Sequence, residues 1–154
     1  LKEVQEVVKG DIIKTPNSFS EVSCVVKTYC SDGKTALVKL DDGLKITPWH
    51  PIRVEGQWRY PCELEEPVES ECEAVYSFVL KANQEDIMIV NGVECATLGH
   101  RYMGEVIGHP YFGSNKVTED LRTMRGWIIG HVELSDHNCL VKDELTGLVC
   151  GLQQ

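Results

Sequence analysis

The sequence predicts an all-β protein, because its strand-forming segments, its turn residues and its lack of helical periodicity all favour strands. Stretches rich in Val, Ile, Thr and aromatic residues recur over the first two thirds of the chain, as is typical of half-buried strands. Turn signals separate them about every 10 to 15 residues, close to the spacing in an all-β sandwich or barrel. The expected strands occupy residues 20–29, 34–43, 43–54, 74–80 and 87–98.

Gly next to Asp, Asn or Glu marks the expected hairpin turns, since such pairs adopt the positive φ angles that tight turns need. These turns are SDGK at 31–34, DDG at 41–43, EGQ at 55–57 and NG at 91–92. Only residues 1–10 and 115–125 show helical periodicity, and both stretches are short. Helix is therefore expected to be a minor component.

A chain of 154 residues, 42% of them hydrophobic, is long enough to bury one sizeable core. The acidic stretch 63–73 contains a proline and is expected to be a solvated loop rather than a packed element. After residue 100 the sequence becomes rich in Gly, His and aromatic residues. We therefore expect a core over residues 1–100 and a carboxyl-terminal extension over residues 101–154 that packs on it.

Charge and cysteine content limit the function classes. A formal charge of -9 disfavours binding to nucleic acid, which depends on Lys and Arg. No apolar run approaches the roughly 20 residues that cross a bilayer, so no membrane partner is expected. The seven cysteines form no CxxC pair, and a reducing, cytoplasmic compartment fits them best. We expect Cys24 and Cys139 to be buried, and Cys62 and Cys72 to stay unpaired.

Two blocks in order resemble the Hint family of inteins and Hedgehog autoprocessing domains. The first block runs from KGDII to ITPWHPI, and the second from VYSFVL to IMIVNGVECATLGH. HPYFG and TGLVCGL near the end resemble the branch that occurs beside von Willebrand A modules. The resemblance covers nearly the whole chain. It implies an all-β Hint-type fold, horseshoe-like with two pseudo-two-fold related hairpin units, followed by a small mixed extension.

The resemblance implies a self-processing activity that needs no cofactor. In the family, a cysteine attacks the carbonyl of the preceding residue and converts an amide into a thioester. By resemblance, His50 protonates the departing nitrogen and Thr47 holds or polarises the same peptide. Pro48 fixes φ and removes a hydrogen-bond donor, so this segment should leave regular strand pairing. The alternative for His50 is a surface histidine in a turn at the end of a strand.

Three departures from the family pattern bear on activity. No cysteine precedes Cys24, so the nucleophile is expected on the protein's own upstream segment or on a complementary amino-terminal fragment, unless the domain is inactive. Lys27 stands where Hedgehog domains carry an Asp, which disfavours sterol transfer. No Asn follows His100 as in inteins, and we interpret the His-Asn-Cys triplet at 137–139 as a turn rather than a splice junction.

Cys95 and His100 are further candidate site residues. The functional interpretation is a second nucleophile with a nearby base, or a pair of zinc ligands together with His109. The structural alternative is a buried cysteine and a capping or surface histidine. No metal is expected, because the spacings lack the paired signature of structural zinc sites.

The leading functional hypothesis is autoproteolysis by an N-to-S acyl shift, with release of the upstream segment. The competing hypothesis is a non-catalytic interaction or structural domain that retains the Hint fold without its chemistry. A protease acting in trans is disfavoured, since the chain contains nothing resembling its nucleophile turns.

Overall fold

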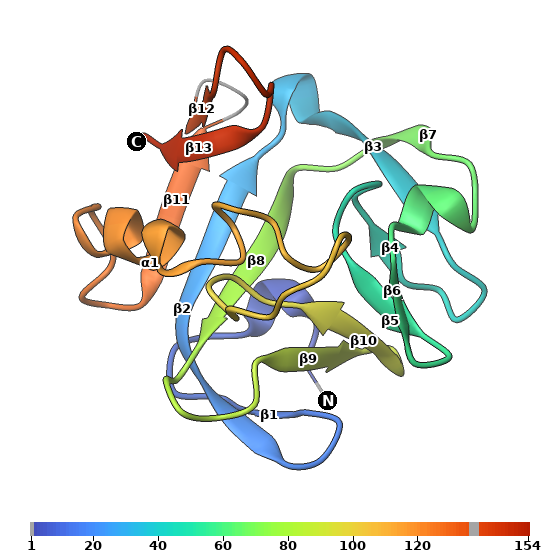
Figure 1. Ribbon diagram of the computed structural model, residues 1–154, viewed down its shortest axis with the longest axis horizontal. Coiled ribbons are helices and arrows are strands. Elements are labelled where there is room, and N and C mark those ends of the chain that lie inside the picture. The colour runs from blue at the N-terminus through green and yellow to red at the C-terminus, as the bar shows by residue number, and fades with distance from the viewer. Residues whose placement is uncertain (1, 136–138) are drawn as a thin grey trace.

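The computed structural model describes residues 2–135 and 139–154, and it confirms the all-β prediction (Figure 1). The helix predicted over residues 115–125 is present as α1, Asn115–Arg122, whereas the described part of the first ten residues, 2–10, contains only a 3-10 turn, Val4–Glu6. The strands are β1 Ile12–Lys14, β2 Phe19–Tyr29, β3 Lys34–Lys39, β4 Lys45–Ile46, β5 Ile52–Val54, β6 Gln57–Arg59, β7 Val68–Glu71, β8 Ala74–Leu80, β9 Ile87–Val90, β10 Val93–Ala96, β11 His131–Ser135, β12 Leu140–Lys142 and β13 Val149–Leu152.

A long bent ribbon runs through the molecule, and each of its two arms is an antiparallel pair of strands. β2 pairs with β8 as far as Tyr29 opposite Ala74, and β3 pairs with β7 from Lys34 opposite Glu71. The hairpin predicted at residues 31–34 is therefore wrong, because β2 and β3 are not partners. Asp32 and Gly33 take positive φ angles of 55° and 67°, and they bend the strand instead of reversing it.

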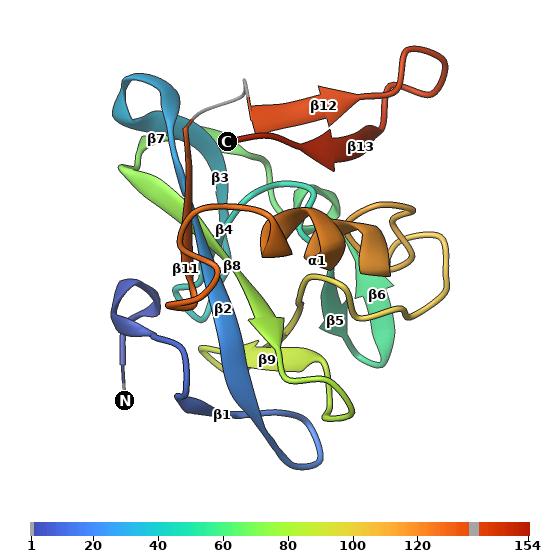
Figure 2. The ribbon, with the colours of Figure 1, turned by 90° about the vertical axis from the view of Figure 1, so that its left-hand side faces the viewer.

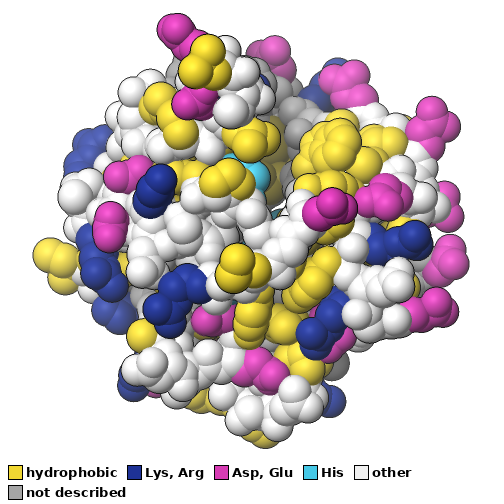
Figure 3. Space-filling model, viewed as in Figure 1, with side chains coloured by type: hydrophobic (Ala, Val, Ile, Leu, Met, Phe, Trp, Pro, Cys, Tyr) yellow, Lys and Arg dark blue, Asp and Glu magenta, His cyan; other side chains and the backbone are white. Residues whose placement is uncertain are grey.

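The prediction that residues 63–73 form a loop is also wrong in part, because β7 lies within this stretch. β7 is an edge strand, since β3 pairs with β4 on its other side. Edge pairing uses main-chain hydrogen bonds, and charged side chains on an edge strand discourage pairing with other molecules. Figure 3 shows acidic side chains gathered along the side of the molecule where β3, β6 and β7 lie.

The other three predicted turns connect hairpins. The turn at 41–43 joins β3 to β4, the turn at 55–57 joins β5 to β6, and Asn91 and Gly92 join β9 to β10. β5 and β10 pair antiparallel, so two hairpins form one sheet in the order β6-β5-β10-β9. The segment between β4 and β5, which carries Thr47 and His50, therefore lies beside the end of β10.

Residues after 100 join the first sheet as well as packing on it. β11 pairs in parallel with β2, with His131 opposite Val25, so β2 has β8 and β11 as neighbours (Figure 1). β12 and β13 form a separate hairpin at one end of the molecule (Figure 2). The predicted boundary at residue 100 stays a prediction. The triplet at 137–139 begins outside the described residues, which include Cys139 but not His137 and Asn138.

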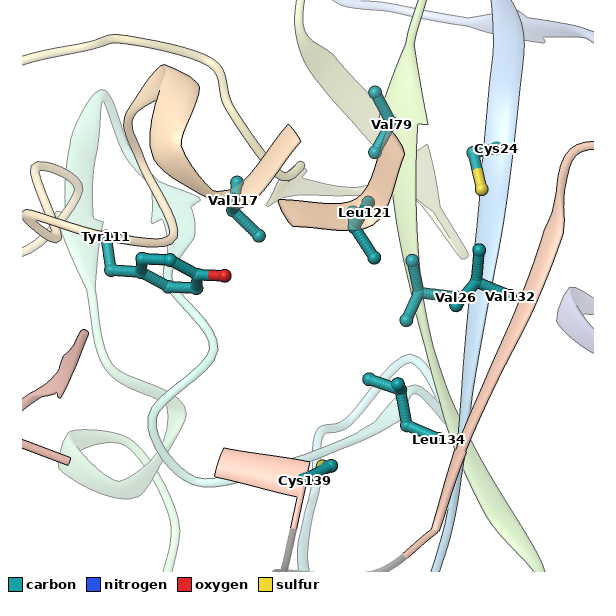
Figure 4. Close-up of a cluster of buried hydrophobic side chains, with 9 residues drawn as sticks. All are labelled: Cys24, Val26, Val79, Tyr111, Val117, Leu121, Val132, Leu134 and Cys139. Carbon is teal, nitrogen blue, oxygen red and sulfur yellow. The ribbon is translucent and has the colours of Figure 1, made fainter. Parts of the chain in front are cut away.

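The largest buried cluster lies between the β2 sheet and α1 (Figure 4). Val117 and Leu121 are fully buried on one face of α1, because residues four apart lie on the same side of a helix. Cys24 and Cys139 are buried here as predicted. The members are Cys24, Val26, Val79, Tyr111, Val117, Leu121, Val132, Leu134 and Cys139.

Ser114 begins α1 and ties it to the preceding loop. Its hydroxyl accepts a hydrogen bond from the Lys116 N–H at 3.2 Å and donates one to the Tyr111 carbonyl at 2.9 Å. We expect Ser114→Ala to lower the free energy of unfolding by about 1 kcal/mol, because a helix donor loses its cap. Urea denaturation measures this change. Ser114→Thr, which keeps the hydroxyl, should stay close to the original value, and an equal loss in both variants would contradict the capping role.

None of the helices in the described part of the chain has the length and apolar character needed to cross a membrane. No disulfide joins any of the cysteines in residues 2–135 and 139–154.

Candidate functional site

A half-open pocket of about 240 Å³ brings together Thr47, His50 and Cys95. It lies between the turn that follows β4, the first half of β8 and the hairpin of β9 and β10. Apolar side chains make most of its wall. The lining residues are Val4, Leu37, Leu44, Lys45, Ile46, Thr47, His50, Glu71, Cys72, Ala74, Val75, Tyr76, Phe78, Met88, Val90, Cys95 and Ala96.

Thr47 and His50 stand at the two ends of a tight turn. The His50 N–H donates to the Thr47 carbonyl at 3.3 Å, and Pro48 occupies the position in such a turn where its fixed φ is favoured. The Pro48 carbonyl accepts a hydrogen bond from the Cys62 N–H at 3.2 Å. The turn is thus outside regular strand pairing, as the sequence predicts, and both side chains face the same pocket.

The His50 ring is fixed against β10. Its Nε2 lies 2.8 Å from the Ala96 carbonyl oxygen, and because a carbonyl only accepts, Nε2 carries the proton in this contact. Burial lowers the pKa of His50 from its ordinary value of 6.5, while the hydrogen bond to Ala96 opposes that change. At neutral pH the ring is therefore neutral, and Nδ1 keeps a lone pair that can take up a proton.

Cys95 contributes to the floor of the pocket, but its environment is that of a core residue. It pairs with Ile52 across β5 and β10 and is 5% exposed. Burial, together with the nearby Asp42 carboxylate, raises the pKa of its thiol to about 12. Because the thiolate is the reactive form of cysteine, this environment favours the structural interpretation of Cys95. Its catalytic role stays a prediction.

His100 lies outside the lining of this pocket and holds the loop that follows β10. Its Nδ1 accepts the Tyr102 N–H at 2.8 Å, and its ring also bonds to the Ile107 backbone. It is 6% exposed, and burial lowers its pKa to about 4. A side chain on Gly113 would come within 3.0 Å of the ring, so glycine is required there. These contacts favour a structural role, and its catalytic role stays a prediction.

The zinc alternative gains no support from the geometry. His109 accepts the Tyr111 and Phe112 N–H groups through Nδ1, both at 3.1 Å. Within residues 2–135 and 139–154, no group of three or more His, Cys, Asp or Glu side chains is arranged to hold a metal ion. Cys95, His100 and His109 are therefore not gathered at one site.

Two residues near the site bear on the other sequence predictions. Lys27 lies over the Tyr29 ring at 4.7 Å and is absent from the pocket lining. Its pKa is raised, first by a hydrogen bond with Tyr29, so its ammonium stays charged. Trp49 is 68% exposed and meets Tyr60 edge-on at 5.1 Å, so it lies outside the core.

Sequence reasoning missed two contributors to the pocket. Cys72 lines it from the short connection between β7 and β8, yet in the sequence it lies in an acidic stretch without a chemical motif. The Ala96 carbonyl positions His50, and a main-chain group leaves no mark in a sequence. By contrast, Val75 and Tyr76 belong to the quoted VYSFVL block, and that block does form one wall.

The family model Vint, described as a Hint domain, matches residues 1–151. None of the curated proteins matches the chain.

Proposed function

Since this chain belongs to the Vint family of Hint domains, we propose that it is a self-processing domain in which Thr47 and His50 promote cysteine-dependent cleavage of its own backbone. The observation that carries the proposal is the shared pocket: both side chains line it from a turn that β10 holds in place. The reacting peptide bond lies before a cysteine on an upstream segment.

The proposed reaction has two steps. The sulfur of the upstream cysteine bonds to the carbonyl carbon of the preceding residue, and the C–N bond of that peptide then breaks to leave a thioester and a free amine. Water or a small thiol next attacks the thioester and releases the upstream segment. The unprotonated nitrogen of a peptide is a poor leaving group, so it must gain a proton as the C–N bond breaks.

His50 suits the proton transfers. A neutral imidazole with a free Nδ1 lone pair takes the thiol proton and then delivers it to the departing nitrogen, so no net proton is consumed. The Thr47 hydroxyl holds the carbonyl oxygen or the amide of the same peptide, since charge develops there in the tetrahedral intermediate. Neither group needs a metal or an organic cofactor for these roles.

In the Hint family the nucleophile is the first residue of the domain, and the buried cysteines of this chain are poorly suited to replace it. Cys24, Cys95 and Cys139 are buried. The thiols of Cys24 and Cys95 also have raised pKa values because of burial, and a protonated thiol is a poor nucleophile. We therefore assign the nucleophile to the upstream segment, which is the substrate and the proposed partner of this domain.

Complementation with a synthetic fragment tests the proposal. A synthetic peptide with an extended, strand-forming sequence supplies the upstream segment and its cysteine. It is mixed with the chain in the presence of a small thiol. We expect time-dependent release of the residues before that cysteine, detected by mass spectrometry. The same peptide with Ala in place of the cysteine should stay intact. A peptide that binds to the chain and is not cleaved would support the competing interpretation, a domain that retains the fold without the chemistry.

A further inference from the structure

The bend of the long ribbon places two thiols against each other. Cys30 directly follows β2 and Cys72 directly precedes the turn into β8. The Cys30 N–H donates to the Glu73 carbonyl at 2.9 Å, and the Cys72 N–H donates to the Gly33 carbonyl at 2.8 Å. These two bonds fix both backbones at the bend, where the Cys72 side chain is close enough to raise the pKa of Cys30 and the Cys72 thiol donates to the Ala74 carbonyl at 3.2 Å. Both residues are half-buried.

Small molecules can reach this pair. Cys30 and Cys72 line an open depression of about 500 Å³ on the outside of the bend, together with Asp32 and Lys34. Cys72 also lines the separate pocket that contains Thr47 and His50. One thiol of the pair therefore belongs to the wall of the candidate active site, while the pair as a whole faces solvent.

We propose that Cys30 and Cys72 form a reversible dithiol–disulfide pair that reacts with small-molecule disulfides such as oxidised glutathione. One cysteine, as the thiolate, attacks a sulfur of the small disulfide, so that a mixed disulfide forms and one glutathione thiolate leaves. The second cysteine then attacks the cysteine sulfur of the mixed disulfide and releases the second glutathione. Two protein thiols are oxidised, and one small disulfide is reduced to two thiols.

The disulfide would close the base of the arm formed by residues 31–71. This arm contains β3 to β7 and carries both Thr47 and His50. Because a cross-link removes conformational freedom from the unfolded chain, and removes more for a longer loop, oxidation should stabilise the protein. This inference goes beyond the proposed function and does not depend on it, since disulfide formation is measured without any cleavage reaction.

Other cysteines give the alternatives against which the pair is tested. Cys62 and Cys95 belong to one apolar cluster, and Cys150 is exposed on β13. Burial, together with the neighbouring Cys72, raises the pKa of the Cys30 thiol to about 11. Exchange that begins at Cys30 should therefore accelerate as the pH rises from 7 to 9, because the thiolate is the attacking species.

The test is to incubate the chain with oxidised glutathione and to map the product. We expect a mass loss of two hydrogen atoms, a peptide link between Cys30 and Cys72, and a rise in Tm of roughly 5–15 °C, all reversed by dithiothreitol. Cys30→Ser should instead gain glutathione adducts without the rise in Tm. Cys150→Ser, which removes an exposed thiol elsewhere, should form the same link as the original chain.

Several results would overturn the proposal. A map that links Cys62 to Cys95, or stable glutathione adducts on both Cys30 and Cys72 of the original chain, would show that the two thiols do not combine. An unchanged or lower Tm in the mapped disulfide form would show that the bend must distort to accept the bond. Because the original chain itself gives these readouts, the test does not rely on the folding of any variant.

Discussion

Replacing His50 by Ala should lower the rate of backbone cleavage by about 10²- to 10⁴-fold, the range for loss of a general acid–base group. The variant lacks the imidazole that lies against Ala96 in the pocket, so the departing nitrogen has no proton donor. The rate is measured as thiol-dependent release of the upstream segment from a precursor that carries the upstream cysteine. Cleavage at the original rate would remove His50 from the mechanism.

A matched histidine separates this effect from general damage. His131 lies on β11 and pairs with Glu133 at 3.1 Å, away from the pocket lining. His131→Ala should therefore cleave at the original rate. Thermal unfolding of both variants shows whether they are folded, and a His50→Ala protein that is folded but inactive is the result we expect.

The pH profile of cleavage should have its acid limb below the ordinary histidine pKa of 6.5, because burial lowers the pKa of His50. The active form is the neutral ring, which persists above the lowered pKa and is lost as the pH falls through it. An acid limb at or above pH 6.5 in the original chain would contradict the assigned environment of His50.

Acidification should destabilise the protein strongly through His100. Its pKa is about 4 in the folded protein, compared with an ordinary value near 6.5 in the unfolded chain. The unfolded state thus takes up a proton first, so stability is full above pH 6.5 and falls as the pH decreases to about 4. The expected loss is on the order of 3 kcal/mol, and denaturant titrations at a series of pH values measure it.

His100→Gln tests the origin of this loss. The variant should be less stable than the original chain at pH 7, because it cannot reproduce both ring contacts, with Tyr102 and Ile107. Its stability should however change less between pH 7 and pH 4. Parallel pH curves for the two proteins would show that another group causes the acid sensitivity.

Local signals predicted the fold well wherever a structure is made by neighbours in sequence. Asn91 and Gly92 have positive φ angles of 50° and 80° and connect β9 to β10, as the turn chemistry predicts. The same reasoning failed at Asp32 and Gly33. A positive φ angle there marks a bend, and only the distant partner strands β7 and β8 decide that the chain does not reverse.

Long-range pairing and main-chain contacts account for what could not be predicted. Nothing in the sequence of β11 indicates that it pairs in parallel with β2, since parallel register depends on the whole topology. The adjacency of Thr47 and His50 was predictable, because only Pro48 and Trp49 lie between them and the proline favours a turn there. The hydrogen-bond partner of His50 was not predictable. It is the main-chain carbonyl of Ala96, and every residue type carries such a carbonyl.

The parallel pairing of β11 with β2 also determines when the domain can be complete during translation. β2 is synthesised before β11, but its pairing along Val25 to Tyr29 requires residues 131–135, which are translated only after all of β3 to β10 and α1. Until then, the edge of β2 and apolar residues such as Val26 lack the cover that β11 and α1 provide. A nascent chain therefore carries its histidine pocket on an unfinished sheet, and self-cleavage should begin only after translation of the domain has finished.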